Sequence, residues 1–209
     1  MLRHVFIDTE TTGTTVGVHQ IIQIAGIART ESNIDFEFSH SVKPINAEDD
    51  SIYSAEALEV NGIKKEDILT FTPAKLVHRN LITSLSSIIN RYDKYDKAFF
   101  VAYNAHFDWE FMYDFFAQNG DKFFGSWFWF PPLDVCGLAQ LVLQKERHRL
   151  PNFKLMTVAR YFGITIDESK LHDAMYDIQL TMELFDFLTK IISVSDWKGE
   201  MQKELLKND

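Results

Sequence analysis

"HVFIDTETTG" (residues 4–13) joins an apolar run directly to two acids, Asp8 and Glu10. The run at residues 5–7 is typical of a buried β-strand. Because side chains alternate along a strand, the two acids share one face. Carboxylates at that spacing repel each other, and burying them without a partner costs free energy. The stretch therefore predicts either a cation held by Asp8 and Glu10 or a solvated strand end.

The composition is that of one globular domain. The chain has 209 residues, 46% of them hydrophobic, which is enough for a sizeable core and excludes a disordered chain. The single cysteine, Cys136, excludes an internal disulfide and fits a reducing compartment. No basic and apolar leader precedes the first strand, and no apolar run approaches the roughly 18 residues of a membrane span. We expect one domain over residues 1–209, soluble, cytoplasmic and not bound to a membrane.

The net charge is −9, whereas proteins that coat nucleic acid non-specifically are usually basic. This charge weighs against a coat protein. It leaves open an enzyme that acts on one strand end, because a few local cations and bound metal ions are enough to hold such an end.

Three strands are predicted near the start of the chain, at residues 3–8, 20–29 and 34–42. Their short connections, the first rich in Gly and Thr, indicate an antiparallel meander. A short helix follows at residues 54–62, with Ser54 as its N-cap and Gly62 as its stop.

The rest of the chain alternates helix and strand. The expected elements are a helix at 73–92, a strand at 97–103, a helix at 106–119, an irregular aromatic segment at 123–132, and helices from 133 onward, interrupted at 145–153 and 163–172. This order predicts an α/β fold with a mixed sheet flanked by helices. Residues 193–209 are expected to form a C-terminal helical extension that packs on the domain or mediates a homodimer.

Acids also stand at the edges of two later core elements. Asp108 falls in the first turn of the helix after the fourth predicted strand, and Asp177 lies on a helix that His172 precedes. Each has an ordinary explanation when taken alone: a helix-start residue, an exposed helix acid, a capping histidine. Together with Asp8 and Glu10 they match a two-metal phosphoryl-transfer site, because two divalent ions about 3.5–4 Å apart need several oxygen ligands. An imidazole that titrates near about 6.5 suits the removal of a proton from water.

Three stretches resemble the exonuclease motifs of the DEDDh superfamily of 3′–5′ exonucleases. They are "FIDTETTG" (6–13), "NAHFD" (104–108) and "HDAMYD" (172–177), and they occur in the family's order within residues 4–188. The superfamily includes the proofreading subunit of bacterial DNA polymerase III, ribonuclease T and oligoribonuclease. The resemblance implies a ribonuclease-H-like fold and metal-dependent release of nucleoside monophosphates from a single-stranded DNA or RNA 3′ end.

The resemblance also implies roles for individual residues. The acids would hold two Mg²⁺ or Mn²⁺ ions, and His172 would be the general base. The implied catalytic metal ligands are Asp8, Glu10, Asp108 and Asp177. The implied substrate-binding residues are Thr11, Thr12, Gly13, Asn61, Asn104 and Phe107. A DNA polymerase or another replication protein would be a further partner.

Two positions depart from the family pattern. Tyr103 stands where the family commonly has a histidine, and Asn61 replaces the histidine of an "HGI" segment. Neither change removes an implied metal ligand, so the departures concern substrate contacts. Tyr176 is one residue off the spacing of the tyrosine-containing sister branch, and His172, five residues before Asp177, favours the histidine branch.

Two further segments could hold a substrate. Residues 144–154 are the most basic stretch and could reach backbone phosphates, although a solvated surface loop is the more frequent use of such a segment. The aromatic residues at 127–130 offer rings for base stacking, although a place in the core or at an interface is more frequent.

Two other functions share part of the pattern. A haloacid-dehalogenase-like phosphatase would use Asp8 as a covalent nucleophile in an Asp-x-Asp-x-Thr motif. This chain has Glu10 at the second acid, and the stretches at 104–108 and 172–177 favour the exonuclease. A non-catalytic scaffold subunit would keep the fold, but such a relative would be expected to lose some of the acids that are all present here.

Overall fold

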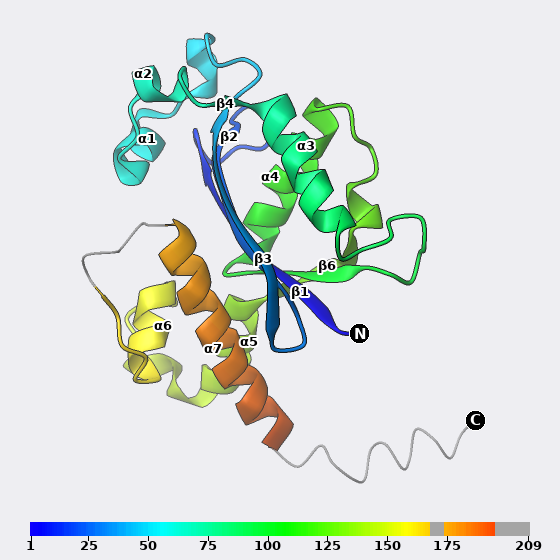
Figure 1. Ribbon diagram of the computed structural model, residues 1–209. Helices are drawn as coiled ribbons and strands as arrows, with labels where there is room; N and C mark the ends of the chain where they lie inside the picture. The colour runs from blue at the N-terminus through cyan, green and yellow to red at the C-terminus, as the bar shows by residue number, and fades with distance from the viewer. Residues whose placement is uncertain (168–173, 195–209) are drawn as a thin grey trace.

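A mixed six-stranded sheet with helices on both faces forms the centre of the computed structural model, which describes residues 1–167 and 174–194 (Figure 1). The strands lie in the order β4-β3-β2-β1-β5-β6. Their bounds are β1 Arg3–Thr11, β2 Ile21–Thr30, β3 Asn33–Lys43, β4 Thr72–Pro73, β5 Ala98–Ala102 and β6 Phe128–Asp134. The predicted mixed α/β sheet is confirmed.

The described helices all come after β3 along the chain. They are α1 Ala55–Asn61, α2 Lys65–Ile68, α3 Ala74–Ser86, α4 Ala105–Gln118, α5 Val135–Leu143, α6 Leu155–Tyr161 and α7 Ala174–Val194. Short 3₁₀ turns lie at η1 Asp50–Ile52, η2 Phe124–Ser126 and η3 Gln144–Arg149. Helix α1 confirms the expected caps: the Ser54 hydroxyl accepts the Ala57 N–H, and Gly62 ends the helix in the left-handed conformation, with φ 65°.

The first three strands form the predicted antiparallel meander, with β1 paired to β2 and β2 to β3. The next strand along the sheet, β5, runs parallel to β1, and β6 runs parallel to β5. Strand β1 therefore lies inside the sheet, between an antiparallel and a parallel neighbour. The chain adds strands first on one side of β1 and then on the other, and in α/β sheets such a reversal of strand order leaves a crevice for ligands at the carboxyl ends of the strands.

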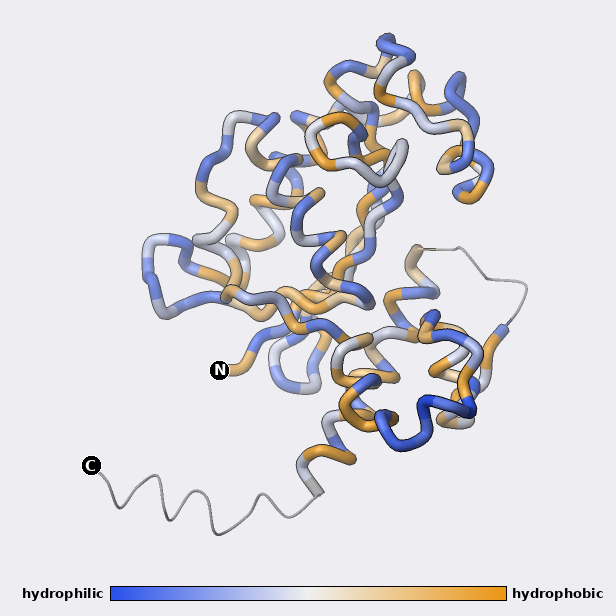
Figure 2. The backbone as a smooth tube through the Cα atoms, turned by 180° about the vertical axis from the view of Figure 1, so that it is seen from behind, coloured by the Kyte–Doolittle hydropathy of each residue, from blue (hydrophilic) through white to orange (hydrophobic). Residues whose placement is uncertain are grey.

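Two hydrophobic clusters cover the two faces of the sheet. Helices α3 and α4 pack with one cluster, which contains Val5 and Ile7 of β1. Helices α5, α6 and α7 pack with the other, which contains Phe6. Figure 1 shows these helix groups on opposite sides of the sheet, and in Figure 2 the hydrophobic colours run along the strands between them. Alternate side chains of β1 thus face different helices.

Strand β6 corrects the expectation of an irregular segment at 123–132. Residues 128–134 pair with β5, with Phe99 opposite Trp129 and Val101 opposite Leu133. The stretch from 130 to 132 bulges out opposite a single residue of β5. Because β6 is an edge strand, its two prolines do not interrupt hydrogen bonds on both sides, which is why a strand tolerates them there.

The end of one helix and the structure of one loop also differ from the expectation. Helix α3 ends at Ser86 rather than near residue 92. The hydroxyls of Ser86 and Ser87 donate to the carbonyls of Ile82 and Ser84, which favours the end of the helix. Ile89 nevertheless stays buried, so the apolar period continues beyond the helix. Within the loop expected at 145–153, residues 144–149 form a 3₁₀ turn.

The C-terminal extension expected at 193–209 lies outside the described residues from position 195 onward. Positions 193 and 194 belong to α7. Within the ranges 1–167 and 174–194, no helix is long and apolar enough to cross a membrane.

We predict that Gly26→Ala destabilises the protein. Gly26 lies in β2 opposite Ile7, and an added Cβ would stand 2.3 Å from Cζ of Phe38 and 2.7 Å from the Phe6 carbonyl oxygen. A backbone oxygen in the sheet cannot give way, so the free energy of unfolding should fall by about 1–3 kcal/mol in urea titrations.

Gly125→Ala is the matched control, because an added Cβ there meets nothing within 4 Å. Its free energy of unfolding should change by no more than about 0.5 kcal/mol. Equal stability of the two variants would contradict the close packing of β1, β2 and β3 at Gly26.

Candidate functional site

Asp8 lies at the centre of a group of acids at the carboxyl end of β1. It shares a face of the strand with Phe6 and Glu10, on the side that α7 covers. Burial raises the pKa of Asp8 well above its usual range, and the negative charges of Asp108, Glu10 and Asp177 raise it further. Asp8 is therefore not part of a simple solvated strand end, because burial and neighbouring acids act on it.

Asp108 approaches the same strand from the opposite face. It is buried in the first turn of α4, and its Oδ1 accepts two hydrogen bonds from Thr9, from the backbone N–H at 2.9 Å and from Oγ1 at 2.8 Å. Burial raises the pKa of Asp108 to about 7, the Thr9 bonds act against that rise, and the charge of Glu10 adds to it. The second motif is thus tied directly to the first.

Asp177 comes from α7, on the face that Phe6 and Asp8 share. It is half-buried, and its charge contributes to the raised pKa of Asp8. The structure therefore brings together all four predicted acids, from a strand and from helices on both faces of the sheet. His172, the predicted general base, lies outside the described residues.

The donor chemistry of this group fits hard divalent cations. Carboxylate oxygens are the ligands that Mg²⁺ and Mn²⁺ prefer, and every cause that acts on the pKa of Asp8 opposes its ionisation. A bound cation would lower the pKa of Asp8 and so favour its ionised form. Among the described residues, however, no three His, Cys, Asp or Glu side chains are already gathered closely enough to hold an ion.

The predicted substrate-binding loop at 11–13 is tied down by its own hydrogen bonds. The Thr11 hydroxyl donates to the Gly13 carbonyl at 2.6 Å. The Thr12 hydroxyl accepts the Gln20 N–H at 2.9 Å, and the Thr12 N–H donates to the Gln20 carbonyl at 2.9 Å. A Cβ on Gly13 would stand 2.4 Å from the His19 ring, so the glycine is needed here for packing against His19.

Asn61, the predicted substrate contact in α1, holds this loop from the other side. Its Nδ2 donates to the Thr11 carbonyl at 2.9 Å, and the Ser54 N–H donates to the Thr12 carbonyl at 2.7 Å. The helix α1 is thereby fixed against the end of β1. A substrate role for Asn61 stays a prediction, alongside this structural one.

Asn104 and Phe107 lie where β5 turns into α4. Asn104 has φ 65°, and its N–H donates to Oδ1 of Asp134 at 2.9 Å. The same oxygen accepts the Ala105 N–H at 3.4 Å and caps α5 through the Cys136 N–H at 3.0 Å. Phe107 is partly buried and packs against the cluster under α3 and α4.

Asp134 is not among the predicted site residues, although it fixes the turn that carries Asp108. A sequence signal for it exists: an acid between a strand and a helix is a common N-cap. Only the structure shows that this cap also holds the start of α4, which lies 29 and 30 residues away along the chain.

The fold uses part of the aromatic segment for its core, whereas the basic stretch at 144–154 lies mostly at the surface. Trp127 and Phe128 are buried in the core, as the more frequent use of such a segment predicts, whereas Phe130 is 76% exposed. In the basic stretch, Arg147 donates to the Leu150 carbonyl, and Arg149 pairs with Glu146 at 2.8 Å.

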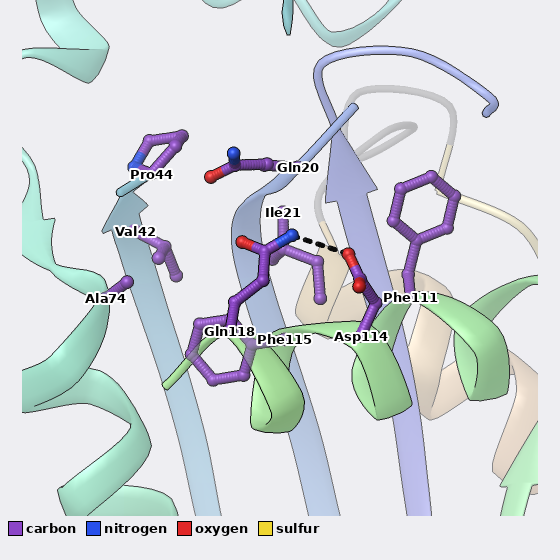
Figure 3. A pocket seen from close by; sticks show the side chains of 9 residues that line it. All are labelled: Gln20, Ile21, Val42, Pro44, Ala74, Phe111, Asp114, Phe115 and Gln118. Carbon is purple, nitrogen blue, oxygen red and sulfur yellow. Dashed lines mark hydrogen bonds between the residues drawn. The ribbon is translucent and has the colours of Figure 1, made fainter. Parts of the chain in front are cut away.

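The ends of β2 and β3 do not enclose a pocket large enough for a substrate. The cavity there lies beside α4, and its free volume is only about 10 Å³ (Figure 3). Its polar side chains include Asp114 and Gln118, which hydrogen-bond to each other at 2.6 Å, and none of its lining residues is a predicted site residue. This cavity is therefore too small for a substrate and holds none of the four acids.

Comparisons with known proteins agree with the predicted motifs. The exonuclease family model (RNase_T) matches residues 5–185. Ribonuclease T from Baumannia cicadellinicola subsp. Homalodisca coagulata is 30% identical over 200 residues, which cover 93% of this chain and 84% of the relative.

Solved structures show the same fold. The structure of E. coli exonuclease I in complex with a dT13 oligonucleotide aligns with a TM-score of 0.71 at 20% identity, over 90% of this chain and 41% of that one. The zinc-bound form of the exonuclease I–single-stranded DNA complex aligns with a TM-score of 0.68 at 21% identity, over 91% and 43%. This chain thus spans less than half of exonuclease I. The likeness confirms the predicted ribonuclease-H-like fold.

We predict that Asp8 and Asp108 contribute stability to the metal-free protein that is lost as pH rises toward about 7. The lowered pKa of His4, His40 and His78 acts in the opposite direction, so the contribution of the two carboxyls is read from a comparison with a variant. The raised pKa of Asp8 and Asp108 lets the folded state keep protons that the unfolded state releases above the ordinary carboxyl pKa. Stability from these two groups is therefore greatest at low pH and is lost as pH rises through the raised values. Urea midpoints measured in EDTA between pH 5 and pH 8 test this.

The variant Asp8→Asn separates the contribution of these acids to stability from that of the other titrating groups. It removes one of the repelling charges, so the midpoint of the wild type should fall relative to that of the variant as pH rises over this interval. Parallel pH profiles for the two proteins would show that repulsion among the acids does not affect stability.

Proposed function

Because this chain belongs to the exonuclease family (RNase_T) within the DEDDh superfamily of 3′–5′ exonucleases, we propose that it removes nucleoside monophosphates from the 3′ end of single-stranded nucleic acid by metal-dependent hydrolysis. The observation that carries the proposal is the convergence of four acids from β1, α4 and α7, which raises the pKa of Asp8. Such an arrangement destabilises the fold unless cations bind there.

Asp8, Glu10, Asp108 and Asp177 would hold two Mg²⁺ or Mn²⁺ ions. When bound, such ions stabilise the charge of the scissile phosphate and activate the attacking water. Two divalent ions would balance the charges of four ionised carboxylates. The metal preference follows from the all-oxygen donor set, since softer metals prefer nitrogen and sulfur ligands.

His172 would act as the general base, taking a proton from the attacking water at an imidazole nitrogen. This role comes from its place five residues before Asp177. An imidazole suits it because its ordinary pKa of about 6.5 lies close to neutral pH.

The 3′ end of the nucleic acid would rest against the loop at 11–13. Asn61, Asn104 and Phe107 would lie beside it. Backbone hydrogen bonds and the Asn61 amide hold this loop in place. A half-buried ring such as that of Phe107 can stack on a base or a sugar. E. coli exonuclease I is described in complex with single-stranded oligonucleotides, which supports a single strand as substrate here.

The whole chain, residues 1–209, would act as one exonuclease domain in the cytoplasm, where its single cysteine would stay reduced. Polymerase binding and a homodimer remain compatible with this assignment. The choice between DNA and RNA depends on contacts to the 2′-hydroxyl, which a matched pair of substrates can reveal.

We predict that Asp8→Ala abolishes cleavage. The purified protein is incubated with 5′-labelled single-stranded DNA or RNA and Mn²⁺ or Mg²⁺, with EDTA in a parallel reaction. The wild type should give a ladder of 3′-shortened products that EDTA removes, and Asp8→Ala should lower the rate by about 10²–10³-fold or more. The faster substrate identifies the preferred nucleic acid.

The matched control is Glu37→Ala, which removes an exposed acid from β3 and should keep wild-type activity. Cleavage that survives EDTA, or that Asp8→Ala retains in full, is incompatible with the proposed mechanism. If the folded wild-type protein binds Mn²⁺ but cleaves neither the DNA nor the RNA, the result favours the non-catalytic scaffold instead.

A second variant tests the general base. His172→Ala should lower kcat by about 10²–10⁴-fold, because a positioned base contributes on that scale. Mn²⁺ binding measured by calorimetry should stay close to that of the wild type. If metal affinity falls and kcat at saturating Mn²⁺ does not, His172 contributes to metal binding rather than to proton transfer.

A further inference from the structure

We propose that Thr9 is a positioning residue that holds Asp108 in place for metal binding. The inference rests on the proposed function, since it gives Asp108 its role as a metal ligand. Thr9 lies between Asp8 and Glu10, on the other face of β1, and would contact neither metal nor substrate. It acts through the carboxylate of Asp108 alone.

The length of the neighbouring strand creates this contact. The pairing of β1 with β5 covers the residues from His4 to Phe6, and β5 ends at Ala102. The N–H of Thr9 therefore lies beyond the last paired residue of β5. Oδ1 of Asp108 accepts that N–H at 2.9 Å, in the place where another strand residue would have done so.

The hydroxyl of Thr9 adds a second bond to the same oxygen, at 2.8 Å. Both residues are buried, so water competes poorly for these bonds. Hydrogen bonds to an ionised carboxylate are stronger than those between neutral groups. Together the two bonds fix one oxygen of Asp108 and restrict the directions in which the other can point.

This restraint opposes the repulsion between the acids. Both bonds from Thr9 end on the same carboxylate oxygen, at 2.9 Å and 2.8 Å, and hold the side chain of Asp108 at the end of β1 beside the other acids. Without the hydroxyl, the side chain of Asp108 would be freer to turn away from Asp8 and Glu10. Metal affinity should then fall even though all four acids remain.

The test compares Thr9→Val with Thr9→Ser. Valine keeps the branched shape and the backbone N–H but loses the hydroxyl, whereas serine keeps the hydroxyl. Mn²⁺ binding is measured by calorimetry on the substrate-free protein, and the Mn²⁺ dependence of cleavage is measured on the preferred oligonucleotide. Thr9→Val should weaken Mn²⁺ binding by about 10–100-fold, the scale of residues that orient metal ligands, and Thr9→Ser should restore most of it.

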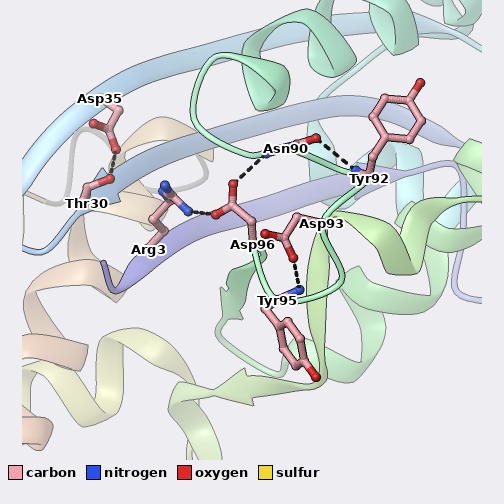
Figure 4. Close-up of polar contacts among 8 residues, drawn as sticks. All are labelled: Arg3, Thr30, Asp35, Asn90, Tyr92, Asp93, Tyr95 and Asp96. Carbon is pink, nitrogen blue, oxygen red and sulfur yellow. Dashed lines mark hydrogen bonds and ion pairs between the residues drawn. The ribbon is translucent and has the colours of Figure 1, made fainter.

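Thr30→Val is the matched control. The Thr30 hydroxyl donates to Oδ2 of Asp35 at 2.8 Å, the same kind of bond at the same length, at the other end of the sheet (Figure 4). This variant should bind Mn²⁺ as the wild type does. The KM for the oligonucleotide at saturating Mn²⁺ should be unchanged in Thr9→Val, because Thr9 does not face the substrate.

The outcomes separate this inference from the proposed function. If the wild type binds Mn²⁺ but cleaves nothing, the proposed function fails, and calorimetry still decides the role of Thr9. Wild-type Mn²⁺ affinity in folded Thr9→Val overturns the inference, as does equal weakening in Thr9→Ser or in Thr30→Val. Should circular dichroism show that Thr9→Val is unfolded, Thr9→Ala takes its place, and equal affinities of Thr9→Ala and Thr9→Ser overturn the inference.

Discussion

The repulsion between carboxylates at the carboxyl end of β1 is the constraint to which the rest of the structure responds. Asp8 is half-buried among three other acids, and each of them raises its pKa. Flexible elements would separate these charges. Here β1 lies between two strands inside the sheet, and α4 and α7 are packed onto opposite faces by separate hydrophobic clusters. Apolar burial far from the site therefore holds together charges that would otherwise move apart.

The unequal lengths of β1 and β5 turn this packing into a site. A longer β5 would satisfy the N–H of Thr9 by strand pairing and would fill the place that Asp108 occupies. Because β5 stops at Ala102, the chain turns at Asn104 in a left-handed conformation and begins α4 next to the uncovered edge of β1. Asp134 secures that turn with one oxygen that accepts three backbone N–H groups. The position of Asp108 thus depends on where a neighbouring strand ends, as well as on its own helix.

The sequence predicted the features that depend on neighbours in the chain. Alternation placed Asp8 and Glu10 on one face, and capping residues located α1 to within a residue at each end. The edge strand β6 was missed because Pro131 and Pro132 usually break strands, and only its place at the sheet edge permits them. The contacts of Thr9 with Asp108 and of Asp134 with Asn104 join residues 99 and 30 positions apart, and no local pattern encodes them. The role of His172 stays a prediction from its spacing.

Gly13 shows how one motif residue can serve two demands. A glycine beside a group of acids suggests close approach by a substrate, yet the space of its missing side chain is filled by the ring of His19. The His19 Nδ1 in turn accepts the Thr15 N–H at 2.8 Å, which closes the loop after β1. A side chain at position 13 would therefore disturb the loop before any substrate arrived. The loop thus keeps its shape through its own contacts and through the bonds from Ser54 and Asn61, whereas the acids are held by the packing of α4 and α7 on the sheet.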